Sequence, residues 1–131
     1  MVCLETTFII DFLKGKNEAK LKMQEIEVRN EVKLVASPSI VELIAGTRYG
    51  KNIKSEKNSI IAFLDSVITL PLDKKSAILA GEIEIDFEDK GSIIDIEEVM
   101  IGAIAIQNNE PLLTRNIKHF ERIKDLKIQA Y

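Results

Sequence analysis

Short, mostly apolar runs alternate with helical segments along the whole chain, and this alternation limits the folds that the chain can adopt. We predict strands at residues 2–6, 33–37, 68–72, 111–114 and 126–130. A segment with helical character separates each of these runs from the next. Strands that alternate with helices build βα units around a parallel sheet. The pattern therefore predicts an α/β fold with a mostly parallel sheet of four to five strands.

The segments between the predicted strands carry the start and stop signals of helices. We expect Ser37 to cap a helix that has proline in its first turn and ends near Gly50. Asp73 is expected to cap a later helix that Gly91 ends. One face of that helix carries apolar residues at helical spacing, namely Leu79, Ala80, Ile83 and Phe87. The run at residues 99–106 is apolar all round, which predicts a helix buried in the domain.

Length and composition indicate a single globular domain, residues 1–131. Apolar residues make up 46% of the chain and charged residues 30%, which excludes a disordered chain. No apolar run approaches the roughly 20 residues that span a bilayer. Met1 leads directly into an apolar run without the basic segment of a signal peptide. We therefore expect a cytoplasmic protein without a membrane partner.

Charge and cysteine content exclude some kinds of site. Cys3 is the only cysteine, so neither an intrachain disulfide nor a thiolate metal cluster can form, and we expect it to be a buried strand residue. The net charge is −3, but residues 82–98 contain eight acids and one lysine, a local charge of −7. The remainder therefore carries +4, which leaves room for a basic surface that binds nucleic acid.

Four polar residues lie at the ends of apolar runs. Glu5 follows the first run, Glu42 comes one turn after the second, Glu98 precedes the buried helix, and Asn116 follows the fourth run. Side chains just beyond the carboxyl ends of parallel strands meet in one crevice. Carboxylates that cluster there repel one another unless a cation lies between them. The spacing therefore predicts a divalent-metal site.

Two blocks of the sequence, residues 1–15 and 96–128, resemble the PIN domain family, particularly the VapC-type toxins of prokaryotic toxin–antitoxin pairs. The similarity covers nearly the whole chain in order and includes the middle acid in SPSIVEL. It implies a three-layer αβα fold, and it implies a ribonuclease that depends on Mg²⁺ or Mn²⁺. An RNA substrate, a cognate antitoxin and a homodimer are further implications.

The resemblance also implies roles for individual residues. Glu5, Glu42, Glu98 and Asn116 fall at the four catalytic positions of the family, and Glu5 and Glu98 would bind the metal. Thr6 and Thr114 match the hydroxyl residues that accompany these acids. Arg115 adjoins Asn116 and is expected to grip a phosphate.

Two departures from the family pattern lead to an alternative hypothesis. The first and third positions usually hold aspartate, but here they hold Glu5 and Glu98. A longer side chain moves the carboxylate by up to about 1.5 Å, and a misplacement near 1 Å costs roughly a hundredfold in rate. The alternative is therefore a PIN-fold protein with weakened or lost nuclease activity that acts mainly by binding a protein partner. A nucleotide-binding domain is not indicated, because neither GxGxxG nor GxxxxGK[ST] occurs.

Other residues have simpler interpretations. A strand-end acid such as Glu5 often caps the next helix, and acids such as Glu98 are common in the first turn of any helix. We expect Asp11 to cap or pair locally and His119 to be a partly buried helix residue. Ile78 and Ile85 lie off the apolar stripe of their helix and are candidates for contact with a partner chain.

Overall fold

A five-stranded parallel sheet forms the centre of the computed structural model, which describes all of residues 1–131. The strands are β1 (Val2–Leu4), β2 (Lys33–Ala36), β3 (Ile68–Leu70), β4 (Leu112–Leu113) and β5 (Ile128–Gln129). Their order is β3-β2-β1-β4-β5, and every neighbouring pair is parallel. The predicted strands and the α/β class are therefore confirmed.

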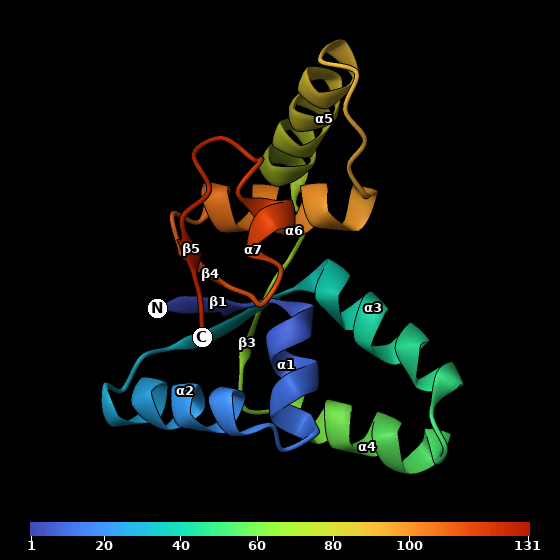
Figure 1. The fold of residues 1–131 in the computed structure, drawn as a ribbon, viewed down its shortest axis with the longest axis vertical. Coiled ribbons are helices and arrows are strands. Elements are labelled where there is room, and N and C mark those ends of the chain that lie inside the picture. The colour runs from blue at the N-terminus through green and yellow to red at the C-terminus, as the bar shows by residue number, and fades with distance from the viewer.

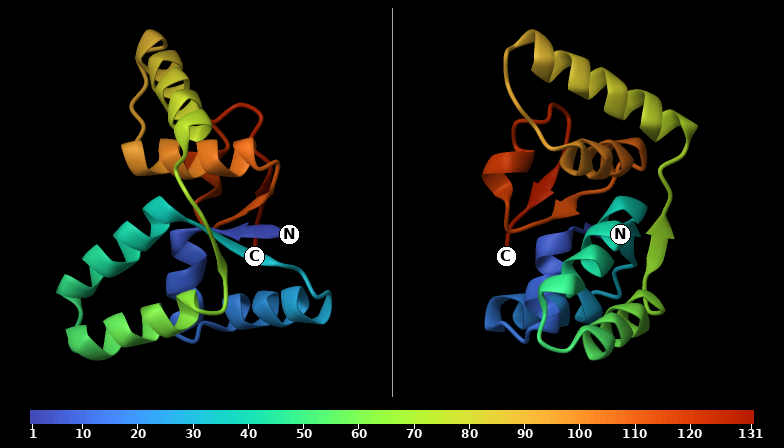
Figure 2. Two further views of the ribbon diagram at one scale, coloured as in Figure 1. Left: turned by 180° about the vertical axis from the view of Figure 1, so that it is seen from behind. Right: turned by 90° about the vertical axis from the view of Figure 1, so that its right-hand side faces the viewer.

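Helices cover both faces of the sheet. They are α1 (Thr6–Leu13), α2 (Asn17–Val28), α3 (Ser37–Gly46), α4 (Ile53–Leu64), α5 (Lys74–Asp89), α6 (Ile96–Gln107) and α7 (Ile117–Phe120), with a 3₁₀ turn η1 (Thr47–Tyr49) after α3. Figure 1 shows α1 to α4 below the sheet and α5 to α7 above it. Figure 2 shows that α5 lies outside α6 and projects from the body of the molecule. The arrangement is the expected three-layer αβα fold.

The alternation of side chains along the strands builds a core on each face of the sheet. Val2 and Leu4 point into the core below, together with Phe8, Ile9 and Val35. The intervening strand residues, among them Cys3, Leu34 and Leu112, point into the core above with Ile101 and Ile104 of α6. Because both faces are covered, the strands β1 and β4 at the centre of the sheet are apolar throughout and fully buried, as is usual in parallel sheets.

Cys3 is fully buried, as predicted, and burial raises the pKa of its thiol to about 12. The thiol is therefore unreactive at neutral pH. None of the helices combines the length and the apolar character needed to cross a membrane.

The predicted N-terminal cap is confirmed for one helix and wrong for another. Asp73 caps α5 as predicted, because its side chain accepts from the Ser76 amide and Ser76 accepts from the Asp73 amide. Ser37, in contrast, does not cap α3; Ala36 occupies the cap position and makes no side-chain bond. The Ser37 hydroxyl instead accepts a hydrogen bond from the Leu72 amide, which ties the start of α3 to the chain after β3. That prediction was wrong because a distant donor competes with the local one.

Candidate functional site

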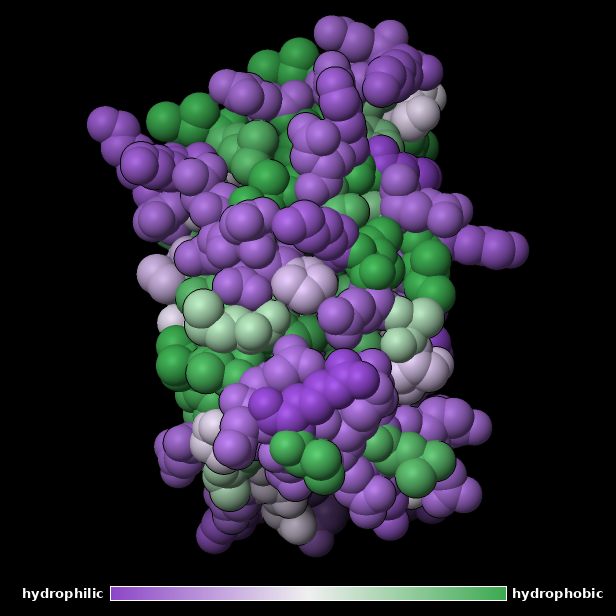
Figure 3. Space-filling model, turned by 90° about the vertical axis from the view of Figure 1, so that its left-hand side faces the viewer, coloured by the Kyte–Doolittle hydropathy of each residue, from purple (hydrophilic) through white to green (hydrophobic).

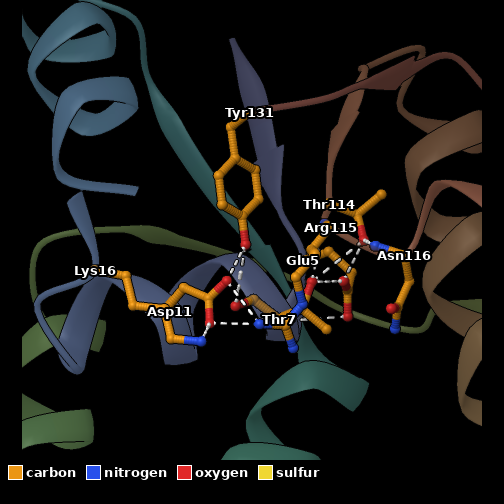
Figure 4. Close-up of polar contacts among 8 residues, drawn as sticks. All are labelled: Glu5, Thr7, Asp11, Lys16, Thr114, Arg115, Asn116 and Tyr131. Carbon is orange, nitrogen blue, oxygen red and sulfur yellow. Dashed lines mark hydrogen bonds and ion pairs between the residues drawn. The ribbon is translucent and has the colours of Figure 1, made fainter. Parts of the chain in front are cut away.

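The carboxyl ends of three strands bring the predicted site residues together. Glu5 follows β1 and precedes α1, while α3, which carries Glu42, begins directly after β2. Thr114 and Asn116 follow β4, the neighbour of β1 on its other side. Figure 4 shows Glu5, Thr114 and Asn116 side by side at this edge. Short loops after parallel strands therefore position the site, as expected for an α/β fold.

Glu5 is held by two threonines. Its side chain is buried, with 3% of the residue exposed. Oε2 accepts from the Thr7 amide at 3.2 Å, so Glu5 caps α1, and Oε1 accepts from the Thr7 hydroxyl at 2.6 Å. The Thr114 hydroxyl also donates to Oε1. The capping interpretation is therefore confirmed, and it is compatible with a site residue whose carboxylate is fixed from α1 and β4.

Glu42 is placed beside the other acids. The Thr6 hydroxyl donates to its Oε1 at 2.6 Å. Burial raises the pKa of Glu42, and the negative charges of Glu5, Glu97 and Glu98 raise it further, against the hydrogen bond from Thr6. The carboxylates of Glu5, Glu42 of α3, and Glu97 and Glu98 of α6 therefore repel one another at this edge of the sheet.

Glu98 lies in the first turn of α6, and it faces α7. His119 lies with Nδ1 2.8 Å from Glu98 Oε1, and Arg122 Nη2 is 3.7 Å from Oε2. Glu98 Oε2 is buried and has no hydrogen-bond partner. Buried oxygens without a partner are rare and often mark a place where a water or an ion binds. His119 lies in α7, as predicted, but its side chain is 57% exposed, so the prediction that it is partly buried was wrong.

The segment after β4 joins this network mainly through its backbone. The Asn116 amide donates to the Thr114 hydroxyl at 2.9 Å, and the Arg115 amide donates to the Thr7 hydroxyl at 3.1 Å. The Arg115 guanidinium binds Asp11 at 2.7 Å. The predicted local pairing of Asp11 is confirmed by its contact with nearby Lys16, and the pair with Arg115 adds a partner far away in sequence that the prediction did not include.

The oxygen atoms at this edge of the sheet meet some of the requirements of a hard cation. The groups at this edge are oxygens, which Mg²⁺ and Mn²⁺ prefer. Glu98 Oε2 has no hydrogen-bond partner, although Arg122 Nη2 lies 3.7 Å from it, and burial and the neighbouring acids raise the pKa of Glu42, so both acids favour a positive charge beside them. However, no three acidic, histidine or cysteine side chains are arranged to hold a metal on their own. A cation here would therefore keep several water ligands, as Mg²⁺ usually does.

Four residues with contacts around the site were missed or misjudged from the sequence: Thr7, His119, Arg122 and Tyr131, whose hydroxyl donates to Asp11. Thr7 adjoins the predicted Thr6, and an N-cap acid two residues before it was a usable signal. The other three reach the site from chain segments whose packing no local pattern describes.

The family model of the PIN domain matches residues 2–126. Ribonuclease VapC2 of Rickettsia felis is 25% identical over 128 residues, which cover 98% of this chain and 96% of the relative. Ribonuclease VapC19 of Mycobacterium tuberculosis is 29% identical over 127 residues, which cover 96% of this chain and 97% of the relative. The solved structure of VapBC2 from Rickettsia felis, bound to a DNA fragment from their promoter, contains a similar chain with a TM-score of 0.89 and 25% identity. That match covers 100% of this chain and 99% of the other.

Proposed function

The chain belongs to the PIN domain family, and from this premise we propose that it is a metal-dependent endoribonuclease, the toxin of a VapBC-type toxin–antitoxin pair. Two similar proteins that match nearly end to end are named ribonucleases. The observation that carries the proposal is the position of Glu42 beside Glu5 and Glu98: burial raises the pKa of Glu42, and the charges of Glu5, Glu97 and Glu98 raise it further.

Glu5 and Glu98 are the proposed metal ligands, directly or through water. Glu42 is a further ligand or orients the attacking water, and Asn116 holds a water at the same edge. When bound, Mg²⁺ or Mn²⁺ supplies positive charge that offsets the charge developing on the scissile phosphate. Thr6 and Thr114 fix Glu42 and Glu5, so the carboxylates stay in position.

Arg115 is the proposed phosphate contact. It lies next to Asn116, and its side chain is 51% exposed although one nitrogen binds Asp11. Arginine binds phosphate through two parallel hydrogen bonds when its donors are available. The positive charge of Arg115 would attract the phosphates of single-stranded RNA to the acidic edge, that is, the edge of the sheet where Glu5, Glu42 and Glu98 lie. Without it, the negative charges there would repel RNA.

The antitoxin is the proposed protein partner, since the similar structure from Rickettsia felis is a VapBC complex. A groove of about 380 Å³ lies between α1, α3, η1 and α4. Ile10, Leu13, Leu43 and Ile60 line its floor, and Glu42 lines it at the site. An amphipathic antitoxin segment would place apolar side chains here and a basic one near Glu42. Mixing with the antitoxin should then abolish RNA cleavage, and cleavage by a stable complex would contradict this mechanism.

A homodimer through α5 is also proposed. Ile78 and Ile85 of α5 are 54% and 59% exposed, and α5 projects from the molecule (Figure 2). On the face shown in Figure 3, apolar groups form separate patches among hydrophilic ones, so that face presents no single continuous apolar surface. Sedimentation velocity measures the oligomeric state of the wild type and of Ile85→Lys. A monomeric wild type would contradict the dimer.

RNA cleavage by purified protein free of antitoxin tests the proposed function. We expect cleavage that needs Mg²⁺ or Mn²⁺, stops with EDTA and is lost in Glu5→Gln and Glu98→Gln. Glu18→Gln, at an exposed acid on α2, is the matched control and should cleave like the wild type. Equal cleavage by all three variants would reject the proposal.

The alternative, a weakened site that acts through partner binding, makes the opposite prediction. Antitoxin-free protein would then bind its partner but show little turnover with any metal. Robust turnover rejects this alternative.

A further inference from the structure

Asp11 is a buried carboxylate that has no place in the proposed metal site. Only 3% of the residue is exposed, and a buried charge is costly unless it is paired and hydrogen-bonded. Arg115 Nη1 donates to Oδ1 at 2.7 Å and to Oδ2 at 2.9 Å. Lys16 Nζ lies 3.4 Å from Oδ1, and the Tyr131 hydroxyl donates to Oδ2 at 2.6 Å. The carboxylate is therefore fully satisfied by groups from three chain segments.

Tyr131 fixes the position of Asp11. Its ring packs edge-on against Phe8, with centroids 4.9 Å apart at 86°. Burial would raise the pKa of Asp11, but the hydrogen bond from Tyr131 and the charges of Arg115 and Lys16 outweigh burial and lower it. Asp11 therefore stays ionised and keeps its hold on Arg115.

Arg115 connects this cluster to the acidic edge. Its amide donates to the Thr7 hydroxyl, which donates in turn to Glu5. Only Nη1 of its guanidinium takes part in the contact with Asp11, and half of the side chain is exposed. Figure 4 shows Asp11, Tyr131 and Arg115 meeting beside Thr7 and Glu5. Nε and Nη2 thus remain as donors next to the site.

We propose that Asp11 and Tyr131 are positioning residues, which aim the Arg115 guanidinium so that its remaining donors bind an RNA phosphate beside Glu5. The inference rests on the proposed function, since it needs RNA as the substrate. The rival explanation is that the cluster only stabilises the fold. The two explanations differ in one respect, because a positioning residue acts on RNA only through Arg115.

RNA binding, measured by fluorescence anisotropy, distinguishes the positioning role from a purely structural one. The probe is a short fluorescein-labelled single-stranded RNA, and the protein carries Glu98→Gln to prevent cleavage, which leaves the Glu5, Thr7 and Arg115 contacts intact. In this background we compare Arg115→Ala, Tyr131→Phe and the double variant. Tyr49→Phe, at the other tyrosine of the chain, and Arg29→Ala, at an exposed arginine directly after α2, are the matched controls. Circular dichroism and thermal melting of every variant report the fold.

We expect Arg115→Ala to weaken RNA binding about tenfold, the loss of one charge-assisted contact. The slope of log affinity against log salt should fall by about 0.7, the value for one phosphate contact on a single strand. Tyr131→Phe should weaken binding by a smaller factor while its ring still packs on Phe8. In the double variant, Tyr131→Phe should add nothing to Arg115→Ala.

Three outcomes would overturn the inference. These are unchanged RNA affinity in Arg115→Ala, an unchanged salt slope in that variant, or an effect of Tyr131→Phe that persists in full without Arg115. If the double variant does not fold, Arg115→Lys replaces Arg115→Ala; it keeps the charge, so the salt slope should hold while the affinity falls. Failure of the proposed function is recognised separately, because wild-type protein would then cleave no RNA.

Discussion

The resemblance to VapC-type toxins leads us to expect aspartate at position 5, but Glu5 carries one methylene more. The neighbouring threonines contact the carboxylate at the end of this longer side chain. Thr7 and Thr114 both donate to Oε1, and the Thr7 amide donates to Oε2. A shorter side chain would draw the carboxylate back by up to about 1.5 Å and break these contacts. Glu5→Asp would therefore lose the contacts that hold this carboxylate in place.

Glu5→Asp should lower RNA cleavage about a hundredfold, because a misplacement near 1 Å has that cost. Steady-state kinetics on a fixed RNA measure the change, with Glu18→Asp on α2 as the control. A strong rise in activity would show instead that the natural site is the weakened one.

Glu42 gives a prediction about pH. Its pKa is raised in the folded state by burial and by neighbouring acids. The folded state therefore binds a proton more tightly than the unfolded chain, and stability falls as pH rises from the ordinary glutamate pKa through the raised one. Glu42→Gln removes this charge and can still accept from Thr6. In metal-free buffer it should melt higher than the wild type at neutral pH.

The difference in melting temperature should shrink as the pH falls below the ordinary glutamate value, because wild-type Glu42 is then neutral as well. Thermal melting across the acid range measures it, and Glu18→Gln should show no such trend. A difference that grows in acid would contradict the raised pKa of Glu42.

Among the elements, α5 is the one whose start is best defined by its own sequence. Asp73 and Ser76 form a reciprocal capping box, and the backbone and side-chain hydrogen bonds from Ser76 lower the pKa of Asp73. The helix packs outside α6 through Ala80, Val99 and Ala103. Loss of the cap should therefore loosen α5 without moving the acids.

Asp73→Ala should lower the melting temperature by a few degrees and leave RNA cleavage unchanged. Asp89→Ala, at the other end of the same helix, is the control and should not destabilise, since an acid near a helix C-terminus is unfavourable. Reduced cleavage in a folded Asp73→Ala protein would show that α5 supports the site.

The elements also show how far the sequence could be read. All five strands and the cap of α5 could be predicted, because periodicity, turn residues and capping residues are local signals. The place of the site could also be predicted, because the carboxyl ends of parallel strands lie at the same edge of the sheet. Ser37 and Asp11 could not be assigned, since their partners, Leu72, Arg115 and Tyr131, are distant in sequence and compete with local ones. The same holds for the contact of His119 with Glu98.

At the scale of the whole molecule, the two layers of helices divide the proposed roles. The layer of α1 and α3 contains Glu42, the helix α1 that Glu5 caps, and the groove proposed for the antitoxin. The layer of α6 and α7 supplies Glu98 and its contacts with His119 and Arg122. The acidic edge lies where both layers meet the ends of β1 and β4. We propose that this edge binds one divalent cation and uses it to cleave RNA.

Isothermal titration with Mn²⁺, read beside RNA cleavage at the same Mn²⁺ concentrations, tests that claim most directly. We predict one binding event per chain, half-saturation of cleavage at the same Mn²⁺ concentration, and loss of both signals in Glu98→Gln but not in Glu18→Gln. RNA cleavage that persists in EDTA, or Mn²⁺ binding that Glu98→Gln leaves unchanged, would contradict it.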